Sequence, residues 1–380
     1  MSERKKVGIV LFQLGGPDSP EAVEPFLYNL FCDPDIIEIP AGWLLRRPLA
    51  RYIARKRSDK VAAHYQEIGG KSPILLLTQR QARALETALA PHMEARCFIA
   101  MRYWHPFTAE AIARLLAFAP DEVVLLPLYP QYSLATTGSS LNEWEREWAR
   151  ALRNGAPGAG HGALNSRAAS AEQPGRDGGL QPGLPAPAES AGLAQPEVAG
   201  AKAIPIRIVR EYHDHPLYID AVVEKIALSL SHFDAPAEVD LLFSAHGLPV
   251  SYIERGDPYQ KQIEATVRLT SERGRALHPG IWPARHVICY QSKVGPQQWL
   301  EPSIHETIHR LAHEGRKNVL VCPVAFVSEH IETLHEINIE TREEAVALGI
   351  EHFEMVPSLN DSAEFIRALA AMVSNIPNPA

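Results

Sequence analysis

The chain has 380 residues, of which 46% are hydrophobic and 22% charged, a globular composition long enough for two domains with cores of their own. Its formal net charge of −8 argues against a general nucleic-acid-binding surface. The cysteines form no C-x-x-C pattern, and we interpret them as reduced residues of a cytoplasmic protein without a disulfide framework or metal cluster; they are Cys32, Cys97, Cys289 and Cys322.

The first predicted element is a strand that begins almost at the amino terminus. Val7–Phe12 is a continuous apolar run, typical of a strand buried on both faces of a sheet. We expect no signal peptide before it and no run of about 18 apolar residues that could span a bilayer. Gly15 and Gly16 follow the strand, but the patterns of phosphate-binding loops are absent, so we reject a nucleotide site.

A basic amphipathic segment follows at Ala41–Lys60. Seven Lys and Arg residues are interleaved there with Trp, Tyr, Leu and Ile. One interpretation is a surface helix whose long cationic side chains cover apolar area. Contact with an anionic membrane surface, or capture of a flat apolar ligand that carries carboxylates, would use the same features. The sequence leaves these interpretations open.

Two further apolar runs before residue 150 predict strands at 95–102 and 123–128. The first ends in Arg102-Tyr103-Trp104-His105, and tyrosines follow the second. A cation and aromatic rings at neighbouring strand ends could form the floor of an aromatic pocket. His105 by itself fits a structural, hydrogen-bonding role equally well.

The stretch Gly155–Gly200 differs from the rest of the chain. Of its 46 residues, 27 are Gly, Ala or Pro, and Phe, Tyr, Trp, Ile, Met and Cys do not occur in it. Such a segment buries too little apolar surface to offset its ordering entropy. We therefore expect a disordered insertion over 151–203 that carries no chemistry.

Alternation of strands and helices resumes after the insertion and predicts an α/β fold. Together with the earlier runs it gives eight strands, the later ones at 204–209, 239–244, 286–290, 318–323 and 352–356. We expect two similar doubly wound, Rossmann-like domains, each with a mainly parallel four-stranded sheet. Residues 1–150 would form the first domain with a lip for the active site, completed by 341–380, and 204–340 would form the second.

His246 follows the strand 239–244 in the sequence SAHGLP. Its neighbours are small, so a ligand could approach the imidazole, which is suited to proton transfer or metal ligation. A capped structural histidine is an equally open alternative. MRYWHP in the first half also places a histidine after a strand, which hints at a duplicated domain.

Glu332, Glu336 and Glu340 form a row with i, i+4, i+8 spacing after the buried strand 318–323. On a helix they would share one face, at the strand end where parallel sheets bind ligands. They could be merely solvated, and Thr333 with Glu336 fits a capping box. A buried carboxylate row would instead raise its own pKa values and hold protons or a cation.

Eight stretches together resemble the ferrochelatase family, and they cover nearly the whole chain outside the insertion. They are LGGPDSPEAVEPFLYNLFCDPDII, IGGKSPI, MRYWHPFT, YPQYSLATTGSSLN, LLFSAHGLP, RGDPY, YQSKVGPQQWL and FVSEHIETLHEINIE. The resemblance implies an enzyme that inserts Fe²⁺ into protoporphyrin IX, held in a cleft between two Rossmann-like domains, to give protohaem.

The resemblance also assigns roles to residues. His246 and Glu332 would be the catalytic and metal-binding pair, facing each other across the porphyrin centre with room for the macrocycle between them. Which of them binds iron and which accepts pyrrole protons stays open. Glu336 and Glu340 would continue a path for protons or metal. Porphyrin contacts would come from Leu14, Arg57, Tyr65, Ser72, Arg102, Tyr103, Trp299, Phe326 and His330.

Two departures refine the expectation. Leu14 stands where some relatives carry a tyrosine, which favours the protoporphyrin type, and no cysteine-bearing tail follows, so no iron–sulfur cluster is expected. We expect a cytoplasmic monomer with protoporphyrin IX and Fe²⁺ as substrates, no permanently bound cofactor, no nucleic-acid partner, and peripheral membrane contact through 41–60. A cobalt chelatase acting on an earlier tetrapyrrole and a haem-binding carrier are the alternatives.

Overall fold

The computed structural model describes residues 4–34, 42–154, 204–293 and 297–374. The expected disordered segment Gly155–Gly200 lies outside the described residues. Its expected start at residue 151 is wrong, because residues 151–154 continue the helix α5 (Ser139–Asn154). The insertion therefore follows a helix directly.

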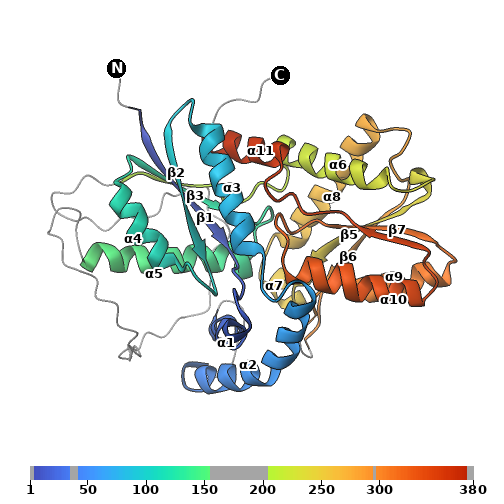
Figure 1. Cartoon of the computed structure of the whole chain (residues 1–380), viewed down its shortest axis with the longest axis horizontal. Helices are drawn as coiled ribbons and strands as arrows, with labels where there is room; N and C mark the ends of the chain where they lie inside the picture. Colours follow the sequence, from blue (N-terminus) through green and yellow to red (C-terminus); the bar gives the residue numbers. More distant parts are fainter. Residues whose placement is uncertain (1–3, 35–41, 155–203, 294–296, 375–380) are drawn as a thin grey trace.

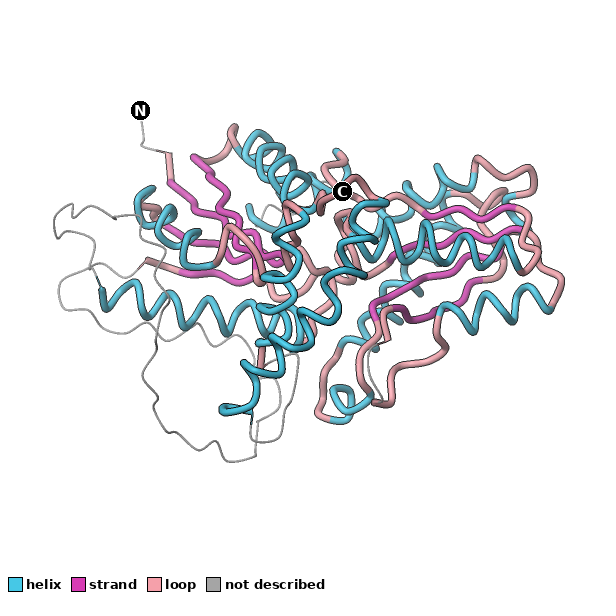
Figure 2. Tube along the Cα trace, turned by 60° about the horizontal axis from the view of Figure 1, so that its bottom comes forward, coloured by secondary structure: helices cyan, strands magenta, loops and turns pink. Residues whose placement is uncertain are grey.

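Two all-parallel, four-stranded sheets form the centre of the described molecule, which confirms the α/β fold (Figure 1). The first has the order β2-β1-β3-β4 and the second β6-β5-β7-β8, so both halves repeat one topology. Figure 2 shows the strands as two separate groups. The eight strands fall where the apolar runs predicted them: β1 (Lys6–Gln13), β2 (Glu94–Met101), β3 (Glu122–Pro127), β4 (Ile206–Ile208), β5 (Asp240–His246), β6 (His286–Gln291), β7 (Asn318–Pro323) and β8 (His352–Met355).

Two strands lie in a different sheet from the one expected. β4 pairs with β3 in the first sheet, although residues from 204 onward were assigned to the second domain. β8 pairs with β7 in the second sheet, although 341–380 was expected to complete the first domain. The change in composition marks an insertion within the connection between α5 and β4, and it does not coincide with the boundary between the sheets.

Helices cover both sheets and connect the strands. They are α1 (Val23–Cys32), α2 (Gly42–Glu67), α3 (Ile74–Leu89), α4 (Thr108–Phe118), α6 (Pro216–Leu230), α7 (Val250–Glu254), α8 (Tyr259–Leu277), α9 (Ile304–His313), α10 (Arg342–Ala347) and α11 (Ala363–Ser374), with 3₁₀ turns η1 (Pro20–Ala22) and η3 (Pro236–Glu238) and π-helices η2 (Leu134–Gly138) and η4 (Glu332–Thr341). The two π-helices follow β3 and β7, which hold equivalent places in the two sheets.

The strand β1 is buried on both faces, as its unbroken apolar run predicts. Ile9 and Leu11 belong to one core cluster, whereas Val10 and Phe12 pack in another with residues of α4 and α5. The first cluster continues through α6 and α11 to Phe243 of β5. Since burial of each such side chain contributes roughly 1.5–3 kcal/mol, this shared core holds the two sheets together.

Helix α11 spans the junction of the two halves. It packs against both α3 and α6, and Figure 1 shows it between these helices along the upper side of the molecule. The carboxy-terminal segment therefore contributes a strand to the second sheet and a helix against the first domain. In the described ranges, every helix is too short or too polar to cross a membrane.

Polar contacts fix the loop after β3 against the second half. The carboxylate of Asp257 accepts hydrogen bonds from Ser133 Oγ at 2.9 Å and from the backbone nitrogen of Leu134 at 2.8 Å. Gln262 Oε1 accepts one from the backbone nitrogen of Tyr132 at 2.7 Å. Because these groups are buried or partly buried, leaving them unpaired would be costly, and the contacts set the orientation of the two domains.

Candidate active site

His246 and Glu332 meet at the carboxyl end of the second sheet. His246 is the last residue of β5, and Glu332 is the first of η4, which follows β7. Because β5 and β7 are adjacent parallel strands, their ends deliver both side chains to one edge. His246 Nδ1 lies 2.8 Å from Glu332 Oε2. The expected gap for a macrocycle between the two residues is therefore absent, and the two side chains are 40% and 20% exposed.

The imidazole of His246 is positioned by its backbone. Tyr259 OH donates to the carbonyl oxygen of His246 at 3.1 Å, and the nitrogen of Gly247 donates to the carbonyl oxygen of Gln291 at 2.7 Å. A Cβ on Gly247 would lie 2.7 Å from that carbonyl oxygen and 3.2 Å from the Trp299 ring. Glycine thus allows the close approach of the Trp299 ring to the backbone that follows His246.

The charges of the pair favour each other. Burial lowers the pKa of His246, but the negative charge of the Glu332 carboxylate raises it by more. The pKa of His246 is therefore above its usual value. Burial raises the pKa of Glu332, but the interactions with His246 and His330 lower it by more. The pKa of Glu332 is therefore well below its usual range. The prediction that the carboxylates raise their own pKa values is therefore wrong for Glu332, because its carboxylate is in direct contact with the imidazole of His246.

Glu336 behaves as predicted for a buried carboxylate. Burial and then the charge of Glu332 raise its pKa. It accepts hydrogen bonds from Ser292 N at 2.7 Å and Ser292 Oγ at 2.5 Å. Thr333 and Glu336 do not form the capping box that the sequence allowed. Instead, the hydroxyl of Thr333 accepts a hydrogen bond from His330 N at 3.1 Å and donates one to the Glu329 carboxylate.

The glutamate row follows η4 outward. In a π-helix each hydrogen bond reaches five residues back, so residues four apart still lie near one another along the same side. The Glu332 side chain is 20% exposed, whereas that of Glu340 is 44% exposed. The row therefore runs from the partly buried end beside His246 toward the solvent side of the helix.

Aromatic rings flank the pair. The Phe326 ring is perpendicular to that of His246 at 6.4 Å between centroids and lies 4.4 Å from that of His330. His330 is buried, and its Nδ1 must carry a hydrogen, because its partner at 3.1 Å is the carbonyl oxygen of Ser328, which only accepts. Its Nε2 lies 3.9 Å from Glu332 Oε2, so Phe326 and His330 flank the pair.

Other predicted porphyrin contacts gather beside Glu332 from the first half. Leu14, Tyr65 and Tyr103 share an apolar cluster with Ile331. Burial, and then the charge of Glu332, raises the pKa of Tyr65 far above its usual value, as expected where a hydroxyl faces a carboxylate. Ser72 is buried, and a Cβ on Gly16 would lie only 2.5 Å from its Oγ.

Arg57 and Arg102 differ in their surroundings. Arg57 is exposed on α2 and lies over the Phe31 ring at 5.7 Å. Arg102 Nη2 pairs with Asp33 Oδ2 at 2.9 Å, and Tyr103 OH donates to the same oxygen at 2.5 Å. The structure therefore brings Leu14, Tyr65 and the ring of Tyr103 into one apolar cluster with Ile331, next to the pair's helix. Arg102 and the hydroxyl of Tyr103 belong to a buried network around Asp33.

The sequence reasoning missed the residues that hold the predicted ones in place. They are Asp33 and Ser139, which join Arg102, and Tyr259, Gln291 and Ser292, which support the His246–Glu332 pair. Ser292 directly follows β6, the neighbour of β5. The rule that adjacent parallel strands end at one edge could have identified it.

A two-domain α/β scaffold with an imidazole and a carboxylate row at its strand ends defines a class of metal-handling enzymes. The family model described as Ferrochelatase matches residues 6–158 and 190–376, so the chain belongs to the ferrochelatase family. It is 43% identical over 370 residues to a ferrochelatase of Thermosynechococcus vestitus, covering 97% of this chain and 81% of that one. It is 42% identical to a ferrochelatase of Geotalea daltonii, covering 99% of both.

A solved structure shares the fold. DR2241 from Deinococcus radiodurans, described as a multi-domain protein with structural similarity to chelatases, matches 98% of this chain and 56% of its own, with a TM-score of 0.50 and 13% identity. This likeness shows the fold alone.

Proposed function

We propose that this protein is a ferrochelatase that inserts Fe²⁺ into protoporphyrin IX, the last step in forming protohaem. The reaction breaks two pyrrole N–H bonds, forms bonds from the ring nitrogens to iron, and releases two protons. Membership of the ferrochelatase family supports the reaction. The observation that carries the assignment to a site is the His246–Glu332 contact at 2.8 Å.

A chain of contacts from His246 to Glu336 supports proton removal along the first part of η4. His246 contacts Glu332, Ser292 Oγ lies 3.4 Å from Glu332 Oε2, and the same hydroxyl donates to Glu336. Glu336 has a raised pKa, which makes it a better proton acceptor than an ordinary glutamate near neutral pH. Protons taken at His246 and Glu332 therefore pass to Glu336, then to Glu340 and solvent, and these carboxylates also attract the incoming cation.

The contact between the two residues bears on how the substrate lies. Because no macrocycle fits between atoms 2.8 Å apart, the porphyrin face approaches both residues from one side. Trp299 and Phe326 supply rigid aromatic walls, and such walls favour a distorted ring whose nitrogens are accessible. Leu14 offers no metal ligand, which supports the protoporphyrin type. We assign the further contacts with the porphyrin to Arg57, Tyr65, Ser72, Arg102, Tyr103 and His330.

An absorbance assay tests this function. Purified protein mixed with protoporphyrin IX and Fe²⁺ under anaerobic conditions, or Zn²⁺ in air, should give many equivalents of metalloporphyrin. Activity confined to Co²⁺ and sirohydrochlorin would favour the cobalt chelatase. Tight porphyrin or haem binding without turnover would favour a carrier.

Helix α2 supports peripheral membrane contact. Leu45, Leu49 and Tyr52 form an exposed apolar stripe, and Arg47 and Arg51 are exposed beside it. An anionic interface would bind both kinds of side chain. Phosphatidylglycerol vesicles should sediment the protein and phosphatidylcholine vesicles should not. Loss of sedimentation in Leu45→Gln/Tyr52→Gln, but not in Leu228→Gln on α6, would assign the contact to this stripe.

We further propose a cytoplasmic monomer with iron only as substrate. All four cysteines are free thiols, and Cys289 and Cys322 pack in different core clusters of the second sheet, an arrangement unsuited to a shared iron–sulfur cluster. Iron analysis of the purified protein, sedimentation velocity and cell fractionation test these statements.

A further inference from the structure

The segment that joins β7 to η4 carries side chains of the central site but belongs to no helix or strand. It covers residues 324–330, all of them within the described ranges, and it contains Phe326 and His330. The backbone groups of such a segment need partners from elsewhere in the molecule. Because Glu332 begins η4 shortly after this segment, its contact with His246 depends on what holds the segment in place.

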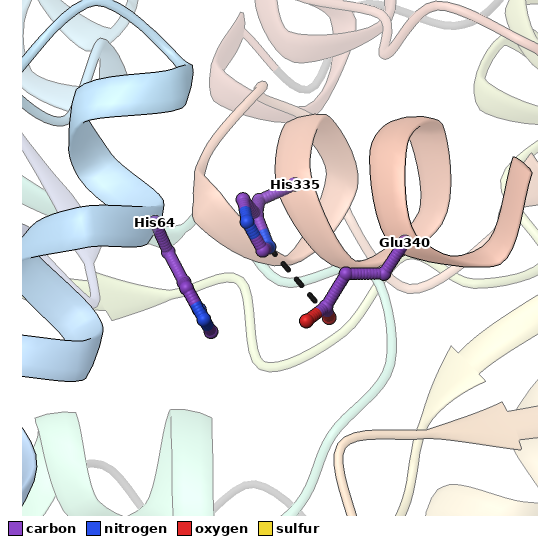
Figure 3. Close-up of side chains that lie close together, drawn as sticks. All are labelled: His64, His335 and Glu340. Atoms are coloured by element: carbon purple, nitrogen blue, oxygen red, sulfur yellow. Dashed lines mark ion pairs between the residues drawn. The ribbon is translucent and has the colours of Figure 1, made fainter. Parts of the chain in front are cut away.

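The helix η4 itself is held from the side of α2. Figure 3 shows His64 of α2 facing His335 of η4, and the two rings stack with centroids 4.0 Å apart and planes at 12°. His335 Nε2 also lies 3.3 Å from Glu67 Oε2 at the end of α2. These contacts fix the side of η4 that faces α2, whereas the segment that leads into the helix is held by a separate set of contacts.

Asn360, in the loop between β8 and α11, supplies that second set. Its backbone nitrogen donates to the carbonyl oxygen of Val327 at 2.7 Å, and its side-chain Oδ1 accepts from the backbone nitrogen of Glu329 at 3.1 Å. Its own carbonyl oxygen accepts from Nε2 of Gln81 on α3 at 2.9 Å. One residue therefore contacts the segment on both sides of Ser328 and ties it to a helix of the first half.

Glu329 extends this set of contacts to the first residues of η4. Its carboxylate accepts a hydrogen bond from the backbone nitrogen of Ser358 at 2.7 Å and another from the hydroxyl of Thr333. The same hydroxyl accepts from the backbone nitrogen of His330 at 3.1 Å. Thr333 is completely buried and directly follows Glu332, so the contacts that hold Glu329 also determine where the Glu332 side chain starts.

We propose that Asn360 is a positioning residue for metal insertion. Its amide oxygen holds the backbone of Glu329, and through Glu329 it keeps the Glu332 carboxylate in contact with the imidazole of His246. It acts through other residues, so its loss displaces the pair without removing either member. This inference rests on the proposed function, because the displacement is measured as a change in the insertion reaction.

The backbone conformation of Asn360 allows its side chain to be tested separately. Its φ of 46° is in the left-handed region, which glycine adopts without strain and asparagine or aspartate adopts more readily than other residues. Asn360→Gly therefore keeps both backbone hydrogen bonds and removes the amide oxygen, whereas Asn360→Asp keeps an acceptor at the same place. A role limited to the backbone turn would leave both variants fully active.

Kinetics of the full-length variants with protoporphyrin IX and Zn²⁺ test the proposal. We expect Asn360→Gly to lower kcat by about tenfold or more, since misplacement of reacting groups by about 1 Å can cost roughly 10²-fold, and Asn360→Asp to recover most of the loss. The affinity for porphyrin, measured by fluorescence quenching, should stay within about twofold in both. Ala119→Gly is the matched control, because Ala119 is exposed, has φ of 52° and precedes β3 at the opposite edge of its sheet.

Two further measurements separate positioning from a general loss of structure. In a Glu332→Gln background, Asn360→Gly should cause no further loss of the residual kcat, because it acts through Glu332; fully additive losses would overturn the proposal. In the unmutated protein, the amide of Glu329 should exchange its hydrogen at least about 10² times more slowly than in an unstructured chain, and an unprotected amide would overturn it even if a variant were damaged. Absence of turnover in the unmutated protein would contradict the proposed function, whereas unchanged turnover in Asn360→Gly would contradict this inference alone.

Discussion

Ser292 holds the carboxylate of Glu336 with two hydrogen bonds, one from its backbone nitrogen at 2.7 Å and one from its hydroxyl at 2.5 Å. The residue adopts a left-handed backbone conformation, with φ of 64°. Its hydroxyl also approaches Glu332. Ser292 therefore lies between two carboxylates and lowers the cost of placing them next to each other.

Loss of the Ser292 hydroxyl should make insertion more sensitive to acid. Its hydrogen bond lowers the pKa of Glu336 against burial and the charge of Glu332, so Ser292→Ala should raise that pKa further. Glu336 would then be protonated over more of the acid range and could not accept further protons. We expect the pH profile of kcat to shift to higher pH. Ser292→Gly relieves the backbone and also lacks the hydroxyl, so an unshifted profile in either variant contradicts this role.

Replacement of either member of the central pair should separate binding from chemistry. His246→Ala and Glu332→Gln should each lower kcat by a factor of about 10² or more, as expected for loss of a group that transfers protons, while porphyrin still binds. Fluorescence quenching of protoporphyrin measures binding, and metalloporphyrin absorbance measures turnover. Unchanged turnover in both variants would exclude the assigned roles, and His105→Ala serves as a control.

The pair should also stabilise the fold in a pH-dependent way. The pKa of His246 is raised above 6.5, so its contribution is fully present below about pH 6.5 and is lost as pH rises through the raised value. The pKa of Glu332 is lowered from 4.5, so its contribution is present above about pH 4.5 and is lost only in stronger acid. The destabilisation caused by His246→Ala, measured by urea unfolding, should be larger at pH 5.5 than at pH 9. The reverse order would contradict the charge assignment.

Asp33 is expected to matter for stability. It is buried and accepts from Arg102, Tyr103 and Ser139 through one oxygen. Removing one partner of a buried ion pair typically costs 3–5 kcal/mol, because the remaining charge is uncompensated, so Asp33→Ala should lose about 3 kcal/mol in the free energy of unfolding. Asp18→Asn, at an exposed position, should stay within about 0.5 kcal/mol. A small effect of Asp33→Ala in urea unfolding would mean that water replaces the carboxylate.

The sequence alone predicted those secondary-structure elements that depend on neighbouring residues in the chain. The apolar run Val7–Phe12 specifies a doubly buried strand, and eight such runs gave the eight strands. Glycines in left-handed conformations, Gly69 and Gly70, follow the end of α2 at Glu67, where glycine is the residue most often found. The common order of the two sheets supports a duplicated domain, although His105 and His246 are not equivalent: one follows β2, and the other ends β5, the counterpart of β1.

Features that depend on tertiary contacts could not be read from the sequence. The spacing of Glu332, Glu336 and Glu340 is compatible with both an α-helix and the observed π-helix. The downward shift in the pKa of Glu332 depends on a 2.8 Å contact with a residue 86 positions away. The role of Asp33 depends on α1 ending beside β2 and α5. The division into domains failed because composition identified an insertion and gave no information on which sheet the following strand joins.

Removal of the insertion is the sharpest test of the compositional reasoning. Residues Gly155–Gly200 lie between α5, which ends at Asn154, and β4, which begins at Ile206 in the same sheet. Replacement by a Gly/Ser linker of about 12 residues shortens the loop by nearly two doublings, which should stabilise the fold by about 1 kcal/mol and leave kcat and KM within about twofold. A same-length scrambled segment serves as the control and should behave like the unmodified chain. A folded deletion variant without turnover would assign chemistry to the segment, and a variant that does not fold would show that it contributes to the core.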